Sequence, residues 1–465
     1  MRGDFSDVKF DSRNHFSRVL KQQGRVQLES DDNEQTEIVL HYLRTFVDDL
    51  LRRPGISASC PTWLRDSFKI GGANPSSSGV FGDLTIQPGH YYVDGILCEL
   101  EQPMNYTEQP DYPGATLPAF PVLVFLDVWE RFVSAAEDDS IREVALGGPD
   151  TAGRSRVVWQ VRAATIRSGI SCTDALKDVL AALEPVDRGL LRVQAGRETA
   201  EETPCLVPPD AHYRGEENQL YRVEIHQGGV AWDGTEGGRT GAATFVWSRD
   251  NGSNAFPIAS FEGDEVTLAT LGRDTRTGLQ EGDLVEVQYE GFVLGDNLEP
   301  TSPPTLRNPP PLLEVKAIDR DAFRVTLEGE LEGVDDPLRE TAKLLRRWDR
   351  RPGAAADQTG LADDGSTFVV ESDDPDEGWI ELENGIEIQF AKNAGAARYR
   401  SGDYWLIPAR TAIGDVRWPR DTNGDLLPAP PRGVEHHYAP LAIVDGTAIT
   451  HCRTAFELTL NPATT

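Results

Sequence analysis

The sequence lacks the features by which membrane and secreted proteins are recognised. Although 39% of its 465 residues are hydrophobic, no window approaches the roughly 18 apolar residues that a spanning helix needs. Its first residues show neither the basic start nor the apolar block of a secretory signal peptide. These absences predict a globular protein with no membrane span that is synthesised in the cytoplasm.

Cysteine is scarce, and its spacing follows no familiar pattern. The count of five is odd, and no CxxC pair occurs. This spacing argues against a disulfide framework or a zinc ribbon and predicts reduced, mostly buried thiols. The cysteines are Cys60, Cys98, Cys172, Cys205 and Cys452.

Basic residues are few relative to acidic ones. The chain has 45 Lys and Arg against 76 Asp and Glu, which gives a net charge of −31. Binding to nucleic acid depends on neutralising phosphates with cations, so a nucleic-acid partner is disfavoured, as is an anionic membrane surface. The simplest interpretation is solubility and protection against unwanted association, and a specific basic partner is the alternative.

Motifs for catalysis and cofactor binding are also missing. The sequence contains no GxSxG, no HExxH, no P-loop and no GxGxxG between a strand and a helix. With so many carboxylates, some pair will lie at glycosidase distance by chance, so carboxylates alone carry no argument. We therefore expect no catalytic residue, no cofactor and no enzyme.

Three short motifs could be functional, but each also has a simpler explanation. Asp421, Asn423 and Asp425 begin like a calcium loop, but the twelfth position holds Arg432 instead of Glu, so an Asx turn is the better account. The two histidines of Glu435–His437 are adjacent and point to opposite faces of a strand, which favours packing beside Tyr438 over a shared metal. The tripeptide at positions 2–4 matches an integrin-binding motif, which occurs often by chance.

Glycine and proline are abundant, at 43 and 31 residues, which favours short strands joined by turns. The length predicts two to four domains. We expect a mainly β chain of several small β-sandwich or barrel modules, preceded by an N-terminal arm and one amphipathic helix. The expected divisions are residues 1–55 (arm and helix), 56–215 (a first β-rich domain with a helical insertion at 171–183), 216–330 (a middle β domain whose units suggest a duplication) and 331–465 (a C-terminal β-rich domain).

The clearest helix signal lies at residues 32–53. Asp31 and Glu34 can form a capping-box-like pair, and an apolar stripe follows at the spacing of one helix face. One stripe means one buried face, either against the body or against another chain. The stripe comprises Val39, Leu43, Phe46 and Leu50, widened by Leu40, Val47 and Leu51.

Strand signals are strongest around the Asp94-Gly95 turn of a hairpin over 90–100 and in the buried run 121–133, whose expected partner is 156–166. Two later stretches, beginning at Phe256 and Leu312, both end in Val-Thr-Leu and suggest a duplicated unit. Residues 184–215 are expected to be a linker or surface excursion, residues 220–225 pair with 243–248, and residues 354–377 form a mobile loop. The choice between sandwich and barrel stays open.

Several segments, spread in order over nearly the whole chain, resemble one family. They are Gly3 to Ser6, Gln22 to Leu28, Asn33 to Gln35, Pro88 to Gly95, Leu220 to His226, Trp247 to Ser253, Tyr404 to Arg410 and Glu435 to Leu441. The chain thereby resembles a family of uncharacterised proteins encoded with bacterial contractile injection systems and other phage-tail-like particles. The chain departs from the family at Glu29 to Asp32, where the family sequence is more apolar.

The resemblance implies a structural subunit at the baseplate or in a shell around it, incorporated into a particle that is released or membrane-associated. Its partners would be other subunits and further copies of itself in a ring. The arm and the helix over 32–53 would dock on a neighbour. The expected interface residues are Gly3, Asp4, Phe5, Phe16, Val19, Leu20, Gln22, Gln23, Arg25 and Leu28.

Two other functions remain open at this stage. The first is a surface- or glycan-binding adhesin, with loops around Trp232 and Trp418 as contact points. The second is a particle-borne hydrolase, which the missing motifs disfavour.

Overall fold

The protein divides into two compact units, and the second is inserted into the first. Unit 1 comprises residues 1–182 and 434–465, and unit 2 comprises residues 183–433. The computed structural model describes residues 10–51, 66–77, 79–112, 114–146, 150–183, 188–196, 213–272, 274, 276–289, 309–310, 312–328, 342–349, 360–392 and 398–453. The fold is mainly β, as expected, with several sheets and a closed barrel. Within these ranges no helix is long and apolar enough to cross a membrane.

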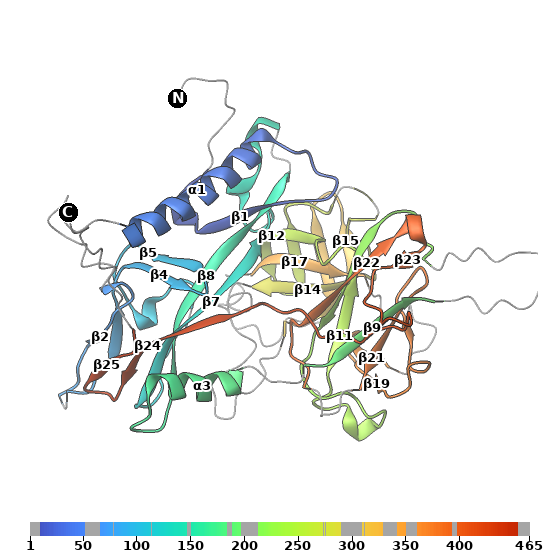
Figure 1. The fold of residues 1–465 in the computed structure, drawn as a ribbon. Helices are drawn as coiled ribbons and strands as arrows, with labels where there is room; N and C mark the ends of the chain where they lie inside the picture. Colours follow the sequence, from blue (N-terminus) through green and yellow to red (C-terminus); the bar gives the residue numbers. More distant parts are fainter. Residues whose placement is uncertain are drawn as a thin grey trace, which may run out of the picture. The chain divides into compact units, whose positions relative to one another are not determined.

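Unit 1 is built on a five-stranded antiparallel sheet of order β1-β8-β7-β24-β25 (Figure 1). Its long central pair joins β7 to β8 from Val122 opposite Thr165 to Val133 opposite Arg154, which confirms the expected pairing. The first eight residues of β7 are all buried because strands flank it on both sides and side chains cover both faces. The strands are β1 (Phe16–Lys21), β2 (Ile70–Ala73), β3 (Asp83–Ile86), β4 (Gly89–Val93), β5 (Ile96–Leu100), β6 (Met104–Asn105), β7 (Val122–Val133), β8 (Ala152–Thr165), β24 (His437–Val444) and β25 (Ile449–His451), and the helices are α1 (Glu29–Leu51) and α3 (Cys172–Leu183).

The predicted hairpin over 90–100 is present as β4 and β5. Asp94 and Gly95 both have positive φ, of 49° and 88°, as a two-residue turn between twisted strands requires. The core of unit 1 lies between this hairpin, the small β2-β3-β6 sheet and the buried face of β7 and β8.

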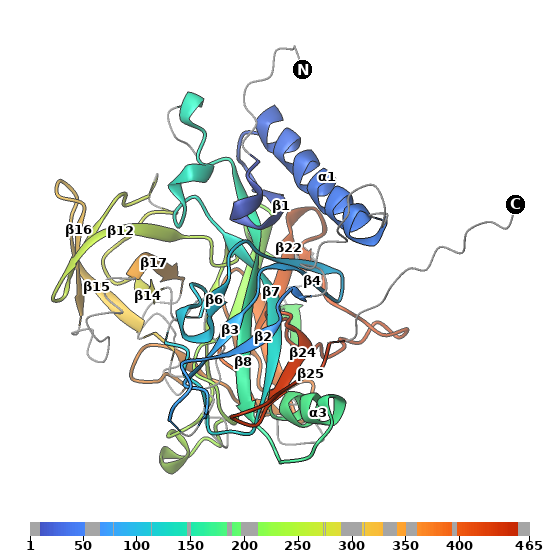
Figure 2. The ribbon, with the colours of Figure 1, turned by 90° about the vertical axis from the view of Figure 1, so that its left-hand side faces the viewer.

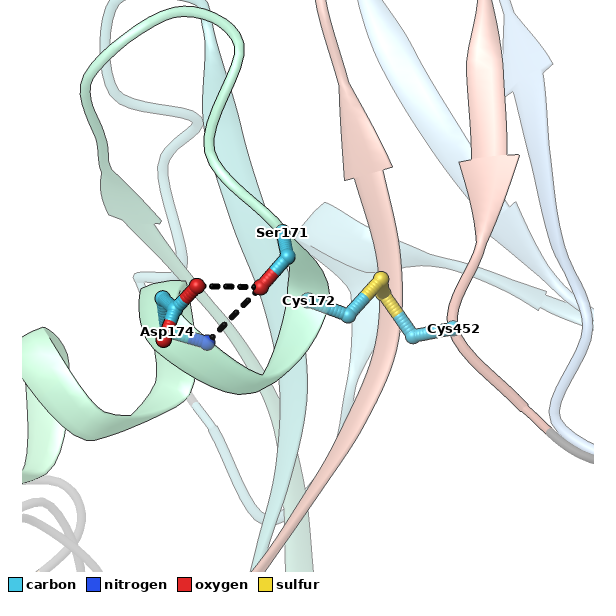
Figure 3. Close-up of a disulfide and its surroundings, with 4 residues drawn as sticks. All are labelled: Ser171, Cys172, Asp174 and Cys452. Atoms are coloured by element: carbon cyan, nitrogen blue, oxygen red, sulfur yellow. Dashed lines mark hydrogen bonds between the residues drawn. A yellow bond between two sulfur atoms is a disulfide. The ribbon is translucent and has the colours of Figure 1, made fainter.

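Helix α3 corresponds to the expected helical insertion, with one correction. The hydroxyl Oγ of Ser171 accepts from the Asp174 backbone N–H over 3.2 Å and donates to the Asp174 carboxylate, so Ser171 is the N-cap (Figure 3). Cys172 forms a disulfide with Cys452, which lies just after β25. The expectation of reduced thiols is therefore wrong for this pair, because folding brings together cysteines 280 residues apart; Cys98 is free and buried as predicted.

Unit 2 contains a β-sandwich and a closed β-barrel. The sequence left the choice between these two architectures open, and both are present. In the sandwich, Phe245 of one sheet packs on Phe390 of the other with ring centroids 5.2 Å apart, and Trp405 packs edge-on against Phe390. One sheet has the order β18-β11-β10-β22-β23, and the other joins β9, β19 and β20 to β21. The strands are β9 (Leu190–Ala195), β10 (Gln219–Ile225), β11 (Thr244–Ser248), β18 (Thr367–Phe368), β19 (Glu371–Ser372), β20 (Ile380–Glu381), β21 (Ile386–Ala391), β22 (Tyr404–Arg410) and β23 (Asp415–Val416).

The barrel explains the weak internal duplication. It closes in the order β12-β13-β16-β15-β14-β17, and its strands are visible at the left of Figure 2. The two Val-Thr-Leu strands pair directly, with Val266 opposite Val325, and both valines are fully buried. The strands are β12 (Ala255–Glu262), β13 (Glu265–Leu268), β14 (Leu284–Tyr289), β15 (Leu312–Asp319), β16 (Arg324–Glu328) and β17 (Ala342–Trp348).

The domain boundaries expected from the sequence differ from those observed. The strands after residue 331 do not form a separate C-terminal domain. Strand β17 belongs to the barrel, β18 to β23 belong to the sandwich, and β24 and β25 belong to unit 1. The expected linker contains β9, and the expected mobile loop contains β18 and β19. Local composition could not reveal these assignments, because each strand is stabilised by partners distant in the sequence.

Candidate functional site

Helix α1 is fixed to unit 1 at its start by a buried ion-pair cluster. Nη2 of Arg154, on β8, lies 2.7 Å from the Glu34 carboxylate and 3.2 Å from that of Asp31. All three side chains are almost fully buried, and Arg154 also donates to the carbonyls of Ala152 and Gly153. The acidic pair expected to cap the helix thus bonds a buried guanidinium instead, which compensates the charge that burial would otherwise leave unpaired.

The middle of α1 covers the edge strand β1. The Gln35 side chain accepts from the Val19 backbone N–H over 2.8 Å, which satisfies a donor on that edge. Ile38 is fully buried in a small cluster with Phe16 and Ile141. The first half of α1 therefore belongs to the fold of unit 1.

Two histidine–carboxylate pairs hold the second half of α1 against the β4–β5 hairpin. His41 Nε2 lies 3.1 Å from Glu99, and His90 Nδ1 lies 3.1 Å from Asp49, which also accepts from the Tyr92 hydroxyl over 2.7 Å. Burial by itself lowers the pKa of His90, but the hydrogen bond and charge of Asp49, with Glu99 nearby, raise it overall. This contact is consequently polar and sensitive to protonation.

The apolar side of α1 is largely exposed, although the Phe46 ring packs edge-on against Tyr92 of β4 with ring centroids 5.9 Å apart. Val39, Leu43, Phe46 and Val47 are between 42% and 55% exposed; we call these four residues the α1 stripe. Their spacing of three and four residues puts them on one helix face, like the a and d positions of a coiled coil. An amphipathic helix normally buries its apolar face. Helix α1 differs, because several of its acidic residues and His41 face unit 1 while most of its apolar stripe is exposed.

A second exposed apolar patch lies near the start of α1. Val26, Val144 and Leu146 are between 51% and 84% exposed; we call them the loop patch. Their segments are joined by the Arg25–Asp150 ion pair at 3.3 Å and by a hydrogen bond from Ser30 to Glu143. Figure 2 shows α1 and the teal segment between β7 and β8 at the same end of unit 1, with β1 between them.

The expected interface residues differ in how far their own unit covers them. Gly3, Asp4 and Phe5 lie outside the described residues. Phe16 is buried and Val19 half-buried in the small cluster with Ile38, and their interface role stays a prediction. Gln22 and Arg25 both bond Asp150 of the same unit.

The remaining expected positions lie around the β1–α1 loop. Gln23 is exposed, and Leu20 and Leu28 are half-buried. The α1 stripe is exposed as well, although none of its four residues is among the expected interface residues. The sequence contained this signal as the stripe, but not the direction in which the stripe faces.

The weak metal candidates do not assemble a site. Asp421 Oδ1 accepts from the backbone N–H groups of Asn423 and Asp425 at 2.7 and 2.9 Å, which is the Asx turn that the sequence favours. These bonds hold the pKa of Asp421 below its usual value. Among the described residues, no group of three or more histidine, cysteine, aspartate or glutamate side chains could hold a metal ion.

The two adjacent histidines serve separate partners. His436 Nδ1 lies 2.6 Å from Asp127, which also accepts from Arg162, and the His436 ring stacks on Tyr438. His437 Nδ1 lies 3.0 Å from Asp94 instead. The packing reading of this motif is confirmed.

The two tryptophans expected in an adhesin use their polar atoms within the chain. The Trp232 indole N–H donates to the carbonyl of Thr235, and that of Trp418 donates to the carbonyl of Leu427. Glycan recognition through these indole N–H groups would first require breaking those bonds.

The carboxyl of Glu286 is a candidate for a catalytic acid. Burial raises its pKa to about 7, although Arg346 opposes the shift. The Trp348 indole N–H donates to its Oε2 over 2.8 Å. A carboxyl that is buried and bonded to a tryptophan on the neighbouring barrel strand fits a structural role.

The fold and the α1 stripe define a class of protein. It is a β-rich chain of two units, one inserted in the other in sequence, with an exposed apolar face on a helix that polar contacts hold to its own unit. The chain belongs to the family described as "Family of unknown function (DUF6519)", whose matches cover residues 1–189 and 163–461. No curated protein and no solved structure matches it.

Proposed function

We propose that this protein is a structural subunit of a contractile injection system or phage-tail-like particle, at the baseplate or in a shell around it. It acts by assembling with neighbouring subunits and carries out no chemistry of its own. The neighbours that contact α1 are further copies of the same chain, arranged in a ring.

The observation that carries this proposal is the outward α1 stripe. Burying apolar side chains contributes about 25 cal/mol per Å², so a fixed apolar helix face gains free energy when a partner covers it. The helix is already held by the buried Arg154 cluster, so presenting the stripe costs little further ordering.

Charge favours a second copy at this place. The chain has a net charge of −31, so most of its surfaces repel one another. Between Val39 and Val47 the only acidic or basic residue other than His41 is Arg44, which is exposed. Two copies can therefore approach here without the repulsion that their other surfaces generate.

The disulfide agrees with a protein made in the bacterial cytoplasm and carried out in a particle. Cys172 and Cys452 are both half-exposed, so an oxidant reaches them once the particle meets oxidising surroundings. We propose that the bond forms at that stage.

The test is to purify sheathed particles from the native host and locate the protein by immunogold electron microscopy. The proposal expects label at one tip of intact tubes. Particles without label, with the protein recovered only outside them, would contradict it and would return weight to the adhesin and enzyme functions.

A further inference from the structure

Two exposed apolar surfaces of unit 1 differ in shape and position. The α1 stripe is a straight row of four side chains on one helix face, whereas the loop patch joins three side chains from two loops. Val39 lies ten residues after the first residue of α1, about 15 Å along the axis at 1.5 Å per residue. The stripe therefore lies well along the helix from the loop patch.

The charges beside the two surfaces differ, because the segment before the loop patch stays acidic although Arg142 pairs with Asp139 at 2.6 Å. The stripe is accompanied by the exposed Arg44. The segment before the loop patch contains Asp138, Asp139 and Glu143 against one arginine, Arg142, and the Asp139 side chain is 88% exposed. A stripe placed on a loop patch brings Arg44 toward an acidic segment.

Contact between two stripes lacks this advantage. In a two-fold pair of α1 helices, the two Arg44 side chains lie on the same contact and repel each other. The same-to-same arrangement also leaves the loop patch of both copies exposed.

We propose that the α1 stripe of one copy docks on the loop patch of the next copy, in a head-to-tail contact. This inference rests on the proposed function, because it names the neighbour's surface in the same assembly. A head-to-tail contact uses different surfaces on the two copies, so each copy uses its stripe toward one neighbour and its loop patch toward the other, and the series closes into a ring when the rotation allows.

The size of the contact favours a closed ring over an open pair. A specific interface commonly has about 20–30 residues on each side, and these two surfaces offer four and three apolar side chains. A single contact of this kind is weak. Ring closure gives every copy two such contacts and makes the last one intramolecular, which raises its effective concentration.

The experiment mixes two complementary variants of the full chain. The stripe variant combines Val39→Glu with Leu43→Lys, an order of charges that supports a helix at a spacing of four. The loop variant combines Val144→Glu with Leu146→Lys. Both leave the net charge unchanged, and both alter exposed positions, so the monomer should fold normally.

Mass in solution distinguishes the arrangements, measured by light scattering after size exclusion. The wild type should form an oligomer and each variant alone should be a monomer of 51.1 kDa. Because only one intact and weak contact can form, the equimolar mixture should contain monomers in equilibrium with pairs of twice that mass, with the share of pairs rising with concentration and nothing larger. A matched control, Val230→Glu with Ile413→Lys, changes exposed apolar residues of unit 2 and should assemble as the wild type does.

Other outcomes overturn the inference in distinguishable ways. If the loop variant alone assembles like the wild type, the stripe does not use the loop patch, while the proposed function stands. If the wild type is a monomer at every concentration reached, the head-to-tail contact is rejected, and the particle labelling still decides the proposed function separately.

Discussion

The two described helices of unit 1 are both amphipathic, yet they face in opposite senses. Helix α3 buries Ala175 and Val179 against its own unit and exposes Lys177 and Asp178. Helix α1 buries acidic residues and exposes its apolar stripe. Helix α3 is held by apolar contact and a disulfide, whereas α1 is held by ion pairs and by the small cluster around Ile38.

The difference shows that an apolar stripe predicts a buried face without naming the partner. For α3 the partner is the same unit. For α1 the polar partners Arg154, His90 and Glu99 occupy the inner side, which leaves the stripe for another surface. Ion pairs and hydrogen bonds thus hold α1 to unit 1 before any other surface covers the stripe.

The largest effect is expected from removing the buried guanidinium under α1. Arg154→Met leaves Asp31 and Glu34 buried without a cation, which should lower the free energy of unfolding by about 3–5 kcal/mol. The measurement is denaturant unfolding, with hydrogen exchange to assign the change to α1 and β1. The control is Arg18→Met, which removes an exposed pair with Glu130 and should cost no more than about 1 kcal/mol. Equal losses in both variants would show that the cluster does not anchor α1.

Removing the disulfide should give the next largest loss of stability, and this loss should affect α3 and not α1. Cys172→Ser should lower the stability of unit 1 by about 2–5 kcal/mol, because the bond closes a long loop in the unfolded chain. Hydrogen exchange in α3 and β25 reports the change. A reductant should weaken the wild type to the level of the variant and leave the variant unaltered; a wild type indifferent to reductant would contradict this.

The same substitution in both helices sharpens the comparison directly. Val179 in α3 is 9% exposed and Val39 in α1 is 55% exposed. Val179→Ala should cost about 1–3 kcal/mol through lost burial, whereas Val39→Ala should change stability by no more than about 0.5 kcal/mol. Thermal unfolding of the dilute monomer measures both. A large loss at Val39 would mean that the stripe packs within the chain.

The smallest effect is expected from pH, at the second half of α1. The pKa of His90 is raised in the folded state, so its contribution to stability is complete below the unfolded value of about 6.5 and is lost as pH rises through the folded pKa. Asp49 and Tyr92 face this imidazole, with Glu99 and Glu101 nearby. Hydrogen-exchange protection of residues 45–51, corrected for the intrinsic rate, should fall as pH rises.

His90→Gln is the control for this pH dependence. It removes the titrating imidazole and should make the protection of residues 45–51 independent of pH over the same range. A variant that keeps the wild-type slope would assign the effect to another group.

Elements whose partners lie close in the sequence were the most predictable. The hairpin at Asp94-Gly95 and the run of β7 followed from turn chemistry and from hydrophobic pattern. The helix predicted over 32–53 is present at 29–51, because its apolar stripe is regular. The stripe did not reveal that Asp31 and Glu34 would pair with Arg154, which lies more than a hundred residues later in the sequence.

Features that depend on distant partners could not be predicted. β9 was missed because it is stabilised by β21, nearly two hundred residues later. The pairing of Cys172 with Cys452 depends on the return of the chain to unit 1, which no local spacing encodes. The duplicated Val-Thr-Leu strands were visible, yet only the closed barrel shows that they pair with each other.

The insertion of unit 2 into unit 1 has a consequence for synthesis on the ribosome. β7 lies between β8 and β24, but β24 follows it by about 300 residues. At roughly 5–20 residues per second, the edge of β7 waits about 15–60 s for its second neighbour while all of unit 2 emerges. Nascent chains are therefore most vulnerable to pairing with one another during that interval, and a chaperone that shields β7 would raise the yield of folded protein.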